Sequence, residues 1–508
     1  MPGTGRPRGA ILLFTTLVLL ACALALVATA AGLATAALRG RLTEHALGEA
    51  REALIAYAAD RPLTSAVGPG YLPCPDLDGD GWAEPTCGSL DGASGADERV
   101  GRLPWKTLGL AELRDGDGEP LWYAVSSKHK GLLNCAASRP CVDMSPAAAL
   151  GAITVRDLSG SVVHDATLAD PARAQQGGAA AVVIAPGAPL ARLGPDGSRV
   201  DQRRECAPGA CDSEGRCILD PPRRAARCDP ANYLDRAPGA AGEDNADFVD
   251  RNDAAGRALD ANGFIQGPVR LPSGEVVVND RIAAITYRDL MPAVMRRVAL
   301  EVVHCLRYYA TRPENAGRYP WPAASCRETA FAGNAPDLEG APLGGVPDTP
   351  FERSAGSSGG RMLERWWRAT PRHPESRDEL PTREDACGIA VAPDDAGPVR
   401  DAPAGTPADE GETASLAGNA WWGTWRPYVS YALARGFSPE GPGTPDCAAG
   451  GCIAIDEATG RNVARGAQVA VIVTASCAEA PACASASCDR VVLAPDPDHT
   501  RHAAATYP

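Results

Sequence analysis

The chain has 508 residues, 45% of them hydrophobic, and carries a formal net charge of -14 at pH 7. This length allows roughly three domains, each with a hydrophobic core of its own. The acidic balance, with only short pairs of arginines, argues against nucleic acid as a partner because phosphate binding requires a concentrated basic surface.

The first predicted element is a long N-terminal helix. No charged residue lies between Arg8 and Arg39, and this apolar run exceeds the about 20 residues that cross the hydrocarbon core of a bilayer. Beyond Arg39, apolar residues continue at helical spacing until Arg61-Pro62, which ends the helix. The residues at this spacing are Leu38, Leu42, Ala46, Leu47, Ala50, Leu54, Tyr57 and Ala58. We therefore predict one helix over residues 10–60, half transmembrane and half amphipathic. The alternative is a signal peptide cleaved after Ala30, Ala31 or Ala37.

A basic leader ending in Gly9, an apolar run and an amphipathic second half together resemble the N-terminal helix of type IV pilins and type II secretion pseudopilins. The resemblance implies that a prepilin peptidase cleaves after Gly9 and leaves Ala10 as the mature residue, open to N-methylation. Most family members have a glutamate five residues after the cut, where this chain has Phe14. That difference points to a minor, atypical subunit.

An acidic loop follows the helix. Asp76, Asp78 and Asp80 alternate and are followed by Gly81, as in the first half of an EF-hand loop, where side-chain oxygens converge on calcium. The twelfth position is Cys87 in place of the bidentate glutamate, so a bound calcium ion requires another ligand, such as Glu84 or a backbone carbonyl. The alternative is an Asp-Gly turn held by Cys74 and Cys87. Calcium is the only cofactor that the sequence indicates.

Glycine-rich turns and short apolar runs predict an antiparallel sheet after this loop. Strands are expected near Trp122–Val125, Ala152–Val155 and Ala179–Ala185, and the sequence Gly-Arg-Leu-Pro-Trp at 101–105 resembles pilin-like heads. A strand at Ile282–Tyr287 then leads into a second helix, capped by Asp289 with Pro292 in its first turn, that ends at Arg312-Pro313. The apolar face expected for this helix comprises Met291, Val294, Met295, Val298, Val302, Cys305 and Tyr309.

Four short segments match between the two halves of the chain in the same order. The segment from Glu52 matches that from His304, and Gly70–Pro75 matches Gly317–Pro322; the other two pairs are Pro120–Ser126 with Trp425–Ala432 and Gly178–Ile184 with Gly466–Ile472. These matches predict an internal duplication of the head.

The sixteen cysteines after the apolar run are an even number, as expected for disulfides in an oxidising compartment, whereas Cys22 lies within the run. No Cys-x-x-Cys motif occurs, which makes zinc the weaker interpretation. The disulfide candidates are Cys74, Cys87, Cys135, Cys141, Cys206, Cys211, Cys217, Cys228, Cys305, Cys326, Cys447, Cys452, Cys477, Cys483 and Cys488, and the partner of Cys387 is left open.

These patterns predict an α+β fold, in which a long N-terminal membrane helix carries a duplicated, disulfide-rich, pilin-like head of helix plus antiparallel sheet. The predicted divisions are a leader (1–9), the helix (10–60), a first head (61–186), a cysteine-rich lobe (187–279), a second pilin-like unit with an inserted loop (280–495) and a flexible tail (496–508). No catalytic motif has its required context, so no enzyme is predicted.

The function that the resemblance implies is a minor pilin or pseudopilin, single-pass in the bacterial inner membrane with a periplasmic or surface head. Its partners would be other pilin subunits, reached through the N-terminal helix, and the prepilin peptidase. The alternative is an anchored extracytoplasmic binding module or adhesin that does not enter a filament.

Overall fold

The computed structural model describes residues 8–60, 69–88, 96–130, 151–168, 177–194, 196–238, 244–248, 263–311, 316–319, 343–345, 425, 428–437, 444–447, 452–457, 462–474, 482–483, 490–493 and 502–507. Two α-helices in this part of the chain organise the molecule, α1 (Arg8–Asp60) and α2 (Tyr287–Thr311). Short 3-10 turns occur at Ala96–Arg99, Pro222–Arg224, Ala226–Cys228, Pro230–Asn232 and Arg435–Phe437.

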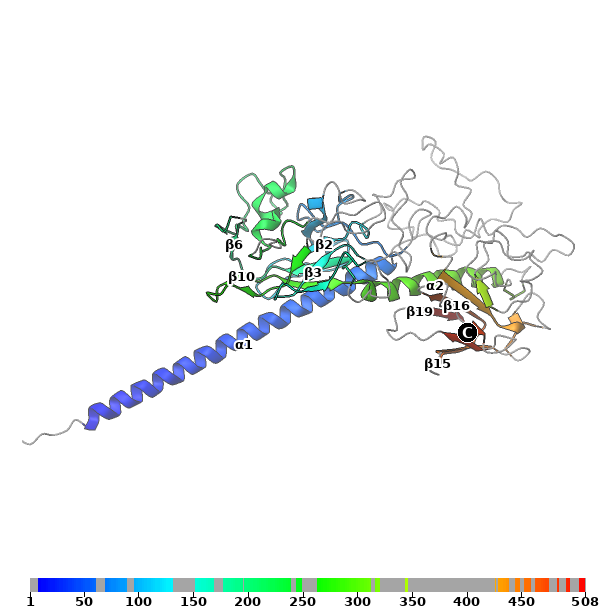
Figure 1. The fold of residues 1–508 in the computed structure, drawn as a ribbon, viewed down its shortest axis with the longest axis horizontal. Coiled ribbons are helices and arrows are strands. Elements are labelled where there is room, and N and C mark those ends of the chain that lie inside the picture. The colour runs from blue at the N-terminus through cyan, green and yellow to red at the C-terminus, as the bar shows by residue number, and fades with distance from the viewer. Residues whose placement is uncertain are drawn as a thin grey trace, which may run out of the picture.

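The helix α1 has two halves with different surroundings. Its first half projects from the body of the molecule (Figure 1), and its described side chains from Phe14 to Leu38 are exposed. Burial begins at Thr43 and follows the predicted period through Ala46, Leu47, Ala50, Leu54 and Ala58. Leu38 and Leu42, which the period placed on the same face, are 58% and 51% exposed. The buried face therefore starts about one turn later than predicted.

The predicted transmembrane helix, and with it the single-pass location in the inner membrane, is contradicted. Among the residues that the structure describes, no helix is both long enough and apolar enough to cross a bilayer. The predicted fold class is therefore wrong in its membrane helix.

The first sheet lies against the second half of α1. Its strands, in order, are β1 (Val100–Arg102), β2 (Trp122–Val125), β5 (Ala181–Ala185) and β11 (Arg281–Ile285), and all its pairs are antiparallel. Both α1 and β5 carry buried apolar residues, and α1 contacts β5 and β11.

Side chains of the central strands alternate between two cores, because successive residues of a strand point to opposite faces. Tyr123 and Val183 belong to the core on the helix side of the sheet, whereas Trp122 and Ile184 belong to the core on the opposite side. Both faces of this sheet are thus covered, which explains why β5 is buried at every position.

The opposite side is covered by the cysteine-rich lobe and a small sheet. Tyr233 packs against Trp122 with ring centroids 5.0 Å apart and the ring planes tilted by 43°, and Phe248 packs on Phe264 at 4.8 Å. The strands here are β3 (Thr154–Arg156), β4 (Val162–His164) and β8 (Gly263–Ile265) in the order β4-β3-β8, the hairpin β6 (Ala191–Leu193) with β7 (Arg199–Asp201), and the pair β9 (Val269–Arg270) with β10 (Val276–Val278).

The helix α2 begins with hydrogen bonds from Thr286 to the Asp289 carboxylate. The Thr286 backbone N–H donates to Asp289 Oδ2 at 2.9 Å, so Thr286 is the N-cap and Asp289 sits three residues into the helix rather than at its cap. Pro292 consequently lies in the second turn, not the first. The apolar face predicted for this helix is buried, with Leu290, Met291, Val294, Met295, Val298, Val302 and Leu306 in the same core as Leu54.

A second four-stranded antiparallel sheet packs on α2. Its order is β12 (Leu343–Gly345), β13 (Val429–Leu433), β16 (Val469–Thr474) and β19 (His502–Tyr507). The predicted tail over 496–508 therefore contains an edge strand, which pairs with β16 through its backbone and needs no apolar sequence pattern to do so. A further sheet has the order β15 (Asn462–Ala467), β14 (Ile453–Glu457), β18 (Arg490–Leu493) and β17 (Ala482–Cys483).

The matched segments of the two chain halves occupy corresponding places. One match pairs β2 of the first sheet with β13 of the second, and another pairs β5 with β16. In each sheet these are the two central strands, and they pair directly with each other. The helix preceding each sheet contacts the third strand, α1 with β5 and α2 with β16. Internal duplication remains a prediction, and this correspondence supports it.

Four disulfides among the described residues confirm that the chain is rich in disulfide bonds. They join Cys74 to Cys87, Cys206 to Cys211, Cys217 to Cys228 and Cys447 to Cys452. Cys22, on the exposed half of α1, is free. The remaining candidates, Cys135, Cys141, Cys305, Cys326, Cys477, Cys483, Cys488 and also Cys387, lie outside the residues or side chains that the structure describes.

Candidate metal centre

The acidic loop is held at both ends by a disulfide and by backbone hydrogen bonds. The Cys74–Cys87 disulfide closes it, with Cα atoms 5.7 Å apart. Its start is fastened to β1, because the Asp76 N–H donates to the Arg102 carbonyl at 3.0 Å and the Arg102 N–H donates back at 2.8 Å. The loop is therefore held in one conformation by the first head.

Three carboxylates converge in this loop. One oxygen each from Asp76, Asp78 and Glu84 lies within 4.8 Å of the others. Glu84 reaches this position because its own N–H donates to the Pro75 carbonyl at 3.2 Å, which folds the end of the loop back onto its beginning.

Asp80 does not join the cluster that the alternating pattern predicted. Its Oδ1 accepts a hydrogen bond from the Trp82 N–H at 2.7 Å, so the side chain caps the next turn. The structure thus brings together Asp76, Asp78 and the alternative ligand Glu84, and leaves Asp80 outside.

Burial is the main electrostatic influence on the cluster. It raises the pKa of Asp76 to about 7, although hydrogen bonds from the Gly81 and Gly79 N–H groups act in the opposite direction. Burial also raises the pKa values of Asp78 and Glu84, and for Glu84 the neighbouring Asp78 contributes in the same direction. Three crowded carboxyl groups favour either a proton or a cation.

Gly81 is required at this turn for two reasons. Its φ of +89° lies in the left-handed region, and a Cβ there would come within 2.7 Å of the Trp105 ring. The Lys106 N–H also donates to the Gly81 carbonyl at 2.8 Å. These contacts hold the loop against the segment that follows β1.

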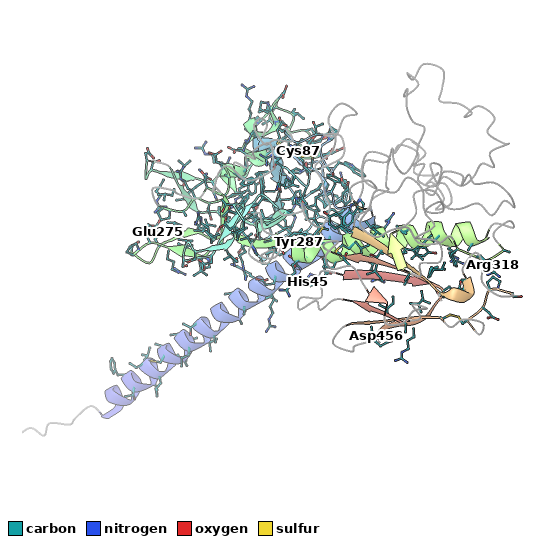
Figure 2. All side chains as sticks on the ribbon, turned by 45° about the vertical axis from the view of Figure 1, so that its right-hand side comes forward. His45, Cys87, Glu275, Tyr287, Arg318 and Asp456 are labelled. Atoms are coloured by element: carbon teal, nitrogen blue, oxygen red, sulfur yellow. A yellow bond between two sulfur atoms is a disulfide. The ribbon has the colours of Figure 1, made fainter. Side chains whose placement is uncertain are left out.

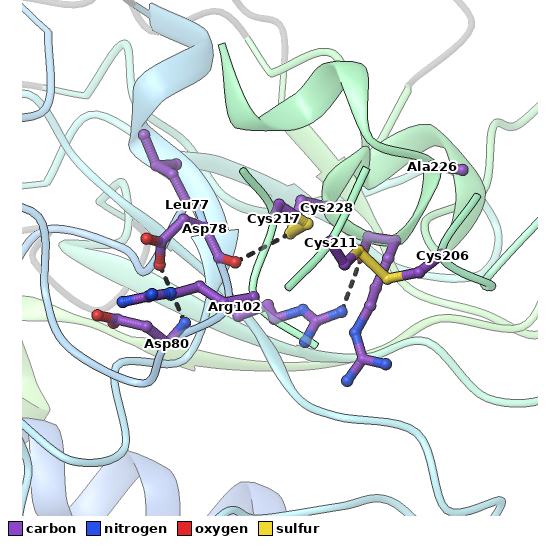
Figure 3. Close-up of a disulfide and its surroundings, with 12 residues drawn as sticks. Leu77, Asp78, Asp80, Arg102, Cys206, Cys211, Cys217, Ala226 and Cys228 are labelled. Atoms are coloured by element: carbon purple, nitrogen blue, oxygen red, sulfur yellow. Dashed lines mark hydrogen bonds between the residues drawn. A yellow bond between two sulfur atoms is a disulfide. The ribbon is translucent and has the colours of Figure 1, made fainter. Parts of the chain in front are cut away.

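The cysteine-rich lobe braces the loop from the other side (Figure 3). The Cys217 N–H donates to the Asp78 carbonyl at 2.7 Å, next to the Cys217–Cys228 disulfide. Arg102 spans the two parts, since its Nη2 donates to the Arg227 carbonyl at 2.7 Å. These contacts could not be predicted from the spacing of residues within the loop, because their partners are more than 100 residues away in the sequence.

The donor set fits a hard cation such as calcium, which is bound by carboxylate and carbonyl oxygens and takes six to eight of them. Asp76, Asp78 and Glu84 would hold the ion, and calcium would supply charge neutralisation and stiffening of the loop. Calcium binding remains a prediction.

Calcium is expected to raise the melting temperature of the protein, and more at pH 8 than at pH 5.5, because the ion competes with the proton that Asp76 holds below about pH 7. At a concentration 100 times its Kd, the ion would add about 2.7 kcal/mol to stability. Calorimetry with and without a chelator measures both effects.

The loop provides its own matched control. Asp78→Asn and Glu84→Gln should abolish the calcium-induced shift, whereas Asp80→Asn keeps the oxygen that caps Trp82 and should retain it. Equal loss in all three variants would instead support the alternating set predicted from the sequence.

The other predicted site residues have simpler environments. Gly9 and Ala10 form the first turn of α1.

No protein-family model matches the chain, and no curated protein or solved structure matches it either.

Proposed function

We propose that this chain is a structural, pilin-like subunit that assembles with other subunits through the projecting half of α1. The observation that carries the proposal is the contrast between the two halves of that helix. One half is part of the head core, and the other presents large apolar side chains without cover from any described residue of this chain.

The exposed apolar side chains form a continuous face. Leu17, Leu20, Leu24 and Val27 follow one another at helical spacing and are 58% to 67% exposed. Apolar surface of this extent marks a site of protein association. Figure 2 shows the projecting half of α1 extending away from the densely packed head.

Small residues on the same half suit close packing of helices. Ala21 and Ala25 are exposed, and no atom lies within 4 Å of the position that a Cβ on Gly32 would occupy. Small side chains allow two helix backbones to approach closely and increase the contact between them. The partner that fits this surface is therefore another apolar helix, such as α1 of a neighbouring subunit.

The variant Leu20→Glu/Leu24→Glu is expected to reduce the amount of protein in assembled filaments by roughly tenfold or more, because each buried, unpaired carboxylate costs several kcal/mol. The head should unfold at an unchanged temperature, since both residues lie outside its core. Filaments isolated from the native host and examined by electron microscopy and immunoblotting provide the measurement.

Val200→Glu is the control, because Val200 is also 58% exposed but lies on β7 of the lobe. Assembly of the α1 variant at the level of the control would overturn the proposal. The mature N-terminus, measured by mass spectrometry, is a separate test: Ala10 would agree with prepilin-type processing, and a terminus after Ala30 or Ala37 would contradict it.

A further inference from the structure

Two disulfides lie next to each other in the cysteine-rich lobe, at a hairpin formed by residues 210–218 (Figure 3). Cys206 and Cys211, which form the first bond, are both half-buried, whereas Cys217 and Cys228, which form the second, are buried. Cys211 packs against the small core cluster that contains Cys217 and Cys228. A reagent in solvent can therefore reach the first disulfide, and the buried disulfide adjoins it.

The hairpin places Cys211 and Cys217 directly opposite each other, as partners of an antiparallel bridge. The backbone hydrogen bonds come from the residues on either side, the Asp212 N–H to the Arg216 carbonyl at 2.9 Å and the Ile218 N–H to the Ala210 carbonyl at 3.1 Å. Cys211 and Cys217 are thus a non-hydrogen-bonded pair, for which the Cα atoms are about 4.5 Å apart and the side chains share one face. A disulfide spans Cα separations of about 4.4 to 6.8 Å. A bond between Cys211 and Cys217 therefore fits this backbone.

The far end of the buried disulfide adjoins a hydrogen-bond acceptor. Cys228 Sγ lies 3.3 Å from the Asp78 carbonyl oxygen. A disulfide sulfur has no proton to donate to this oxygen, whereas the thiol of a released Cys228 is a weak donor. Transfer of Cys217 from Cys228 to Cys211 would therefore add a hydrogen bond between the lobe and the acidic loop.

We propose that the lobe is a thiol-exchange site, at which a small thiol such as glutathione opens the Cys206–Cys211 bond and the buried bond then exchanges. The thiolate of the small molecule attacks Cys206 Sγ, forms a mixed disulfide there and releases Cys211 as a thiolate. The Cys211 thiolate attacks Cys217 Sγ, so the Cys211–Cys217 bond forms and the Cys217–Cys228 bond breaks. Cys228 leaves as a thiolate and takes up the proton that the small thiol lost. Two disulfides exist before and after, so no other oxidant or reductant takes part.

The test uses the full-length protein, incubated with glutathione, labelled with N-ethylmaleimide, digested with trypsin without reduction and examined by mass spectrometry. Trypsin separates Cys217 and Cys228 from each other and from the peptide that holds both Cys206 and Cys211. The expected product has glutathione on Cys206, a cross-link between Cys211 and Cys217, and label on Cys228. Glutathione or label confined to Cys206 and Cys211 would overturn the proposal, and so would label on Cys217, which direct reduction of the buried bond would give.

Two serine variants test the exchange step without added thiol. Cys206→Ser leaves Cys211 as a free thiol opposite Cys217, so label is expected on Cys228. Cys211→Ser is the matched control, because it frees Cys206, which lies outside the paired hairpin, and label should stay on Cys206. Label confined to Cys211 in the first variant would contradict the exchange. The reaction is independent of filament assembly, so its failure would leave the proposed function untouched.

Discussion

Replacing Leu54 by alanine is expected to lower the free energy of unfolding by about 2 to 5 kcal/mol, the range for a leucine removed from a packed core. Leu54 lies on the second half of α1, is fully buried, and belongs to a core that includes Met291 of α2 and Val183 of the first sheet. Urea denaturation of the full-length protein, followed by tryptophan fluorescence, measures the change.

Leu38→Ala on the same helix is the matched control, because Leu38 is 58% exposed. Its effect should stay within about 0.5 kcal/mol. Similar losses for the two variants would contradict the division of α1 into a core half and a projecting half.

The second large effect concerns pH. Stability is expected to fall as the pH rises from about 4 through 6 and beyond, owing to the buried carboxyl pair Asp235 and Asp280. Burial raises the pKa of Asp235 to about 6 and that of Asp280 well above its usual range, and the Asp235 charge adds to the rise at Asp280.

The sign follows from proton uptake. Both groups hold a proton in the folded protein at pH values where the unfolded chain, with pKa values near 3.8, has lost it. The pair therefore stabilises the fold fully below about pH 4, and this contribution is lost as the pH passes through the folded pKa values. Asp76 acts in the same direction.

Asp280→Asn should make the fall in stability with pH less steep by about 1.4 kcal/mol per pH unit within this window, the value for one proton. In the natural protein the Asp235 N–H and Asn245 Nδ2 each donate to Asp280 Oδ2 at 2.8 Å. The oxygen of an asparagine at this position can still accept both hydrogen bonds. Urea denaturation between pH 4 and 8 gives the slope. Glu214→Gln, at an exposed turn, is the control, and equal slopes for both variants and the natural protein would refute the assignment.

Sequence pattern located the elements whose signal is local. The apolar face and the Arg-Pro stop predicted α2 to within a residue or two of its observed end at Thr311, and the apolar run at 179–185 predicted β5. In both cases the residues that form the element are also the ones that become buried, so the local pattern of apolar residues was sufficient to predict it.

Features built from distant segments were not predictable in this way. Arg156, His164 and Arg288 meet in one groove only because β3, β4 and α2 are brought together by the tertiary fold. In the acidic loop, the alternating aspartates suggested Asp80 as a ligand, whereas a backbone hydrogen bond from Glu84 to Pro75 changes which carboxylates converge. The apolar run of α1 predicted a membrane span, which the described helices do not support.

The close connection between β11 and the start of α2 bears on how copies of this chain would pack in the proposed assembly. Only Thr286 separates β11 from this helix, and its apolar face is buried from Leu290 onward, so in the part of the chain that the structure describes α2 has no exposed half like the first half of α1 (Figure 1). In the assembly proposed above, each copy would therefore bring the bulk of two sheet-bearing units and attach through α1. Around a shared bundle of rods, such a wide head would occupy the space of its neighbours. A position at the end of the proposed filament, with neighbours on one side only, would relieve that crowding.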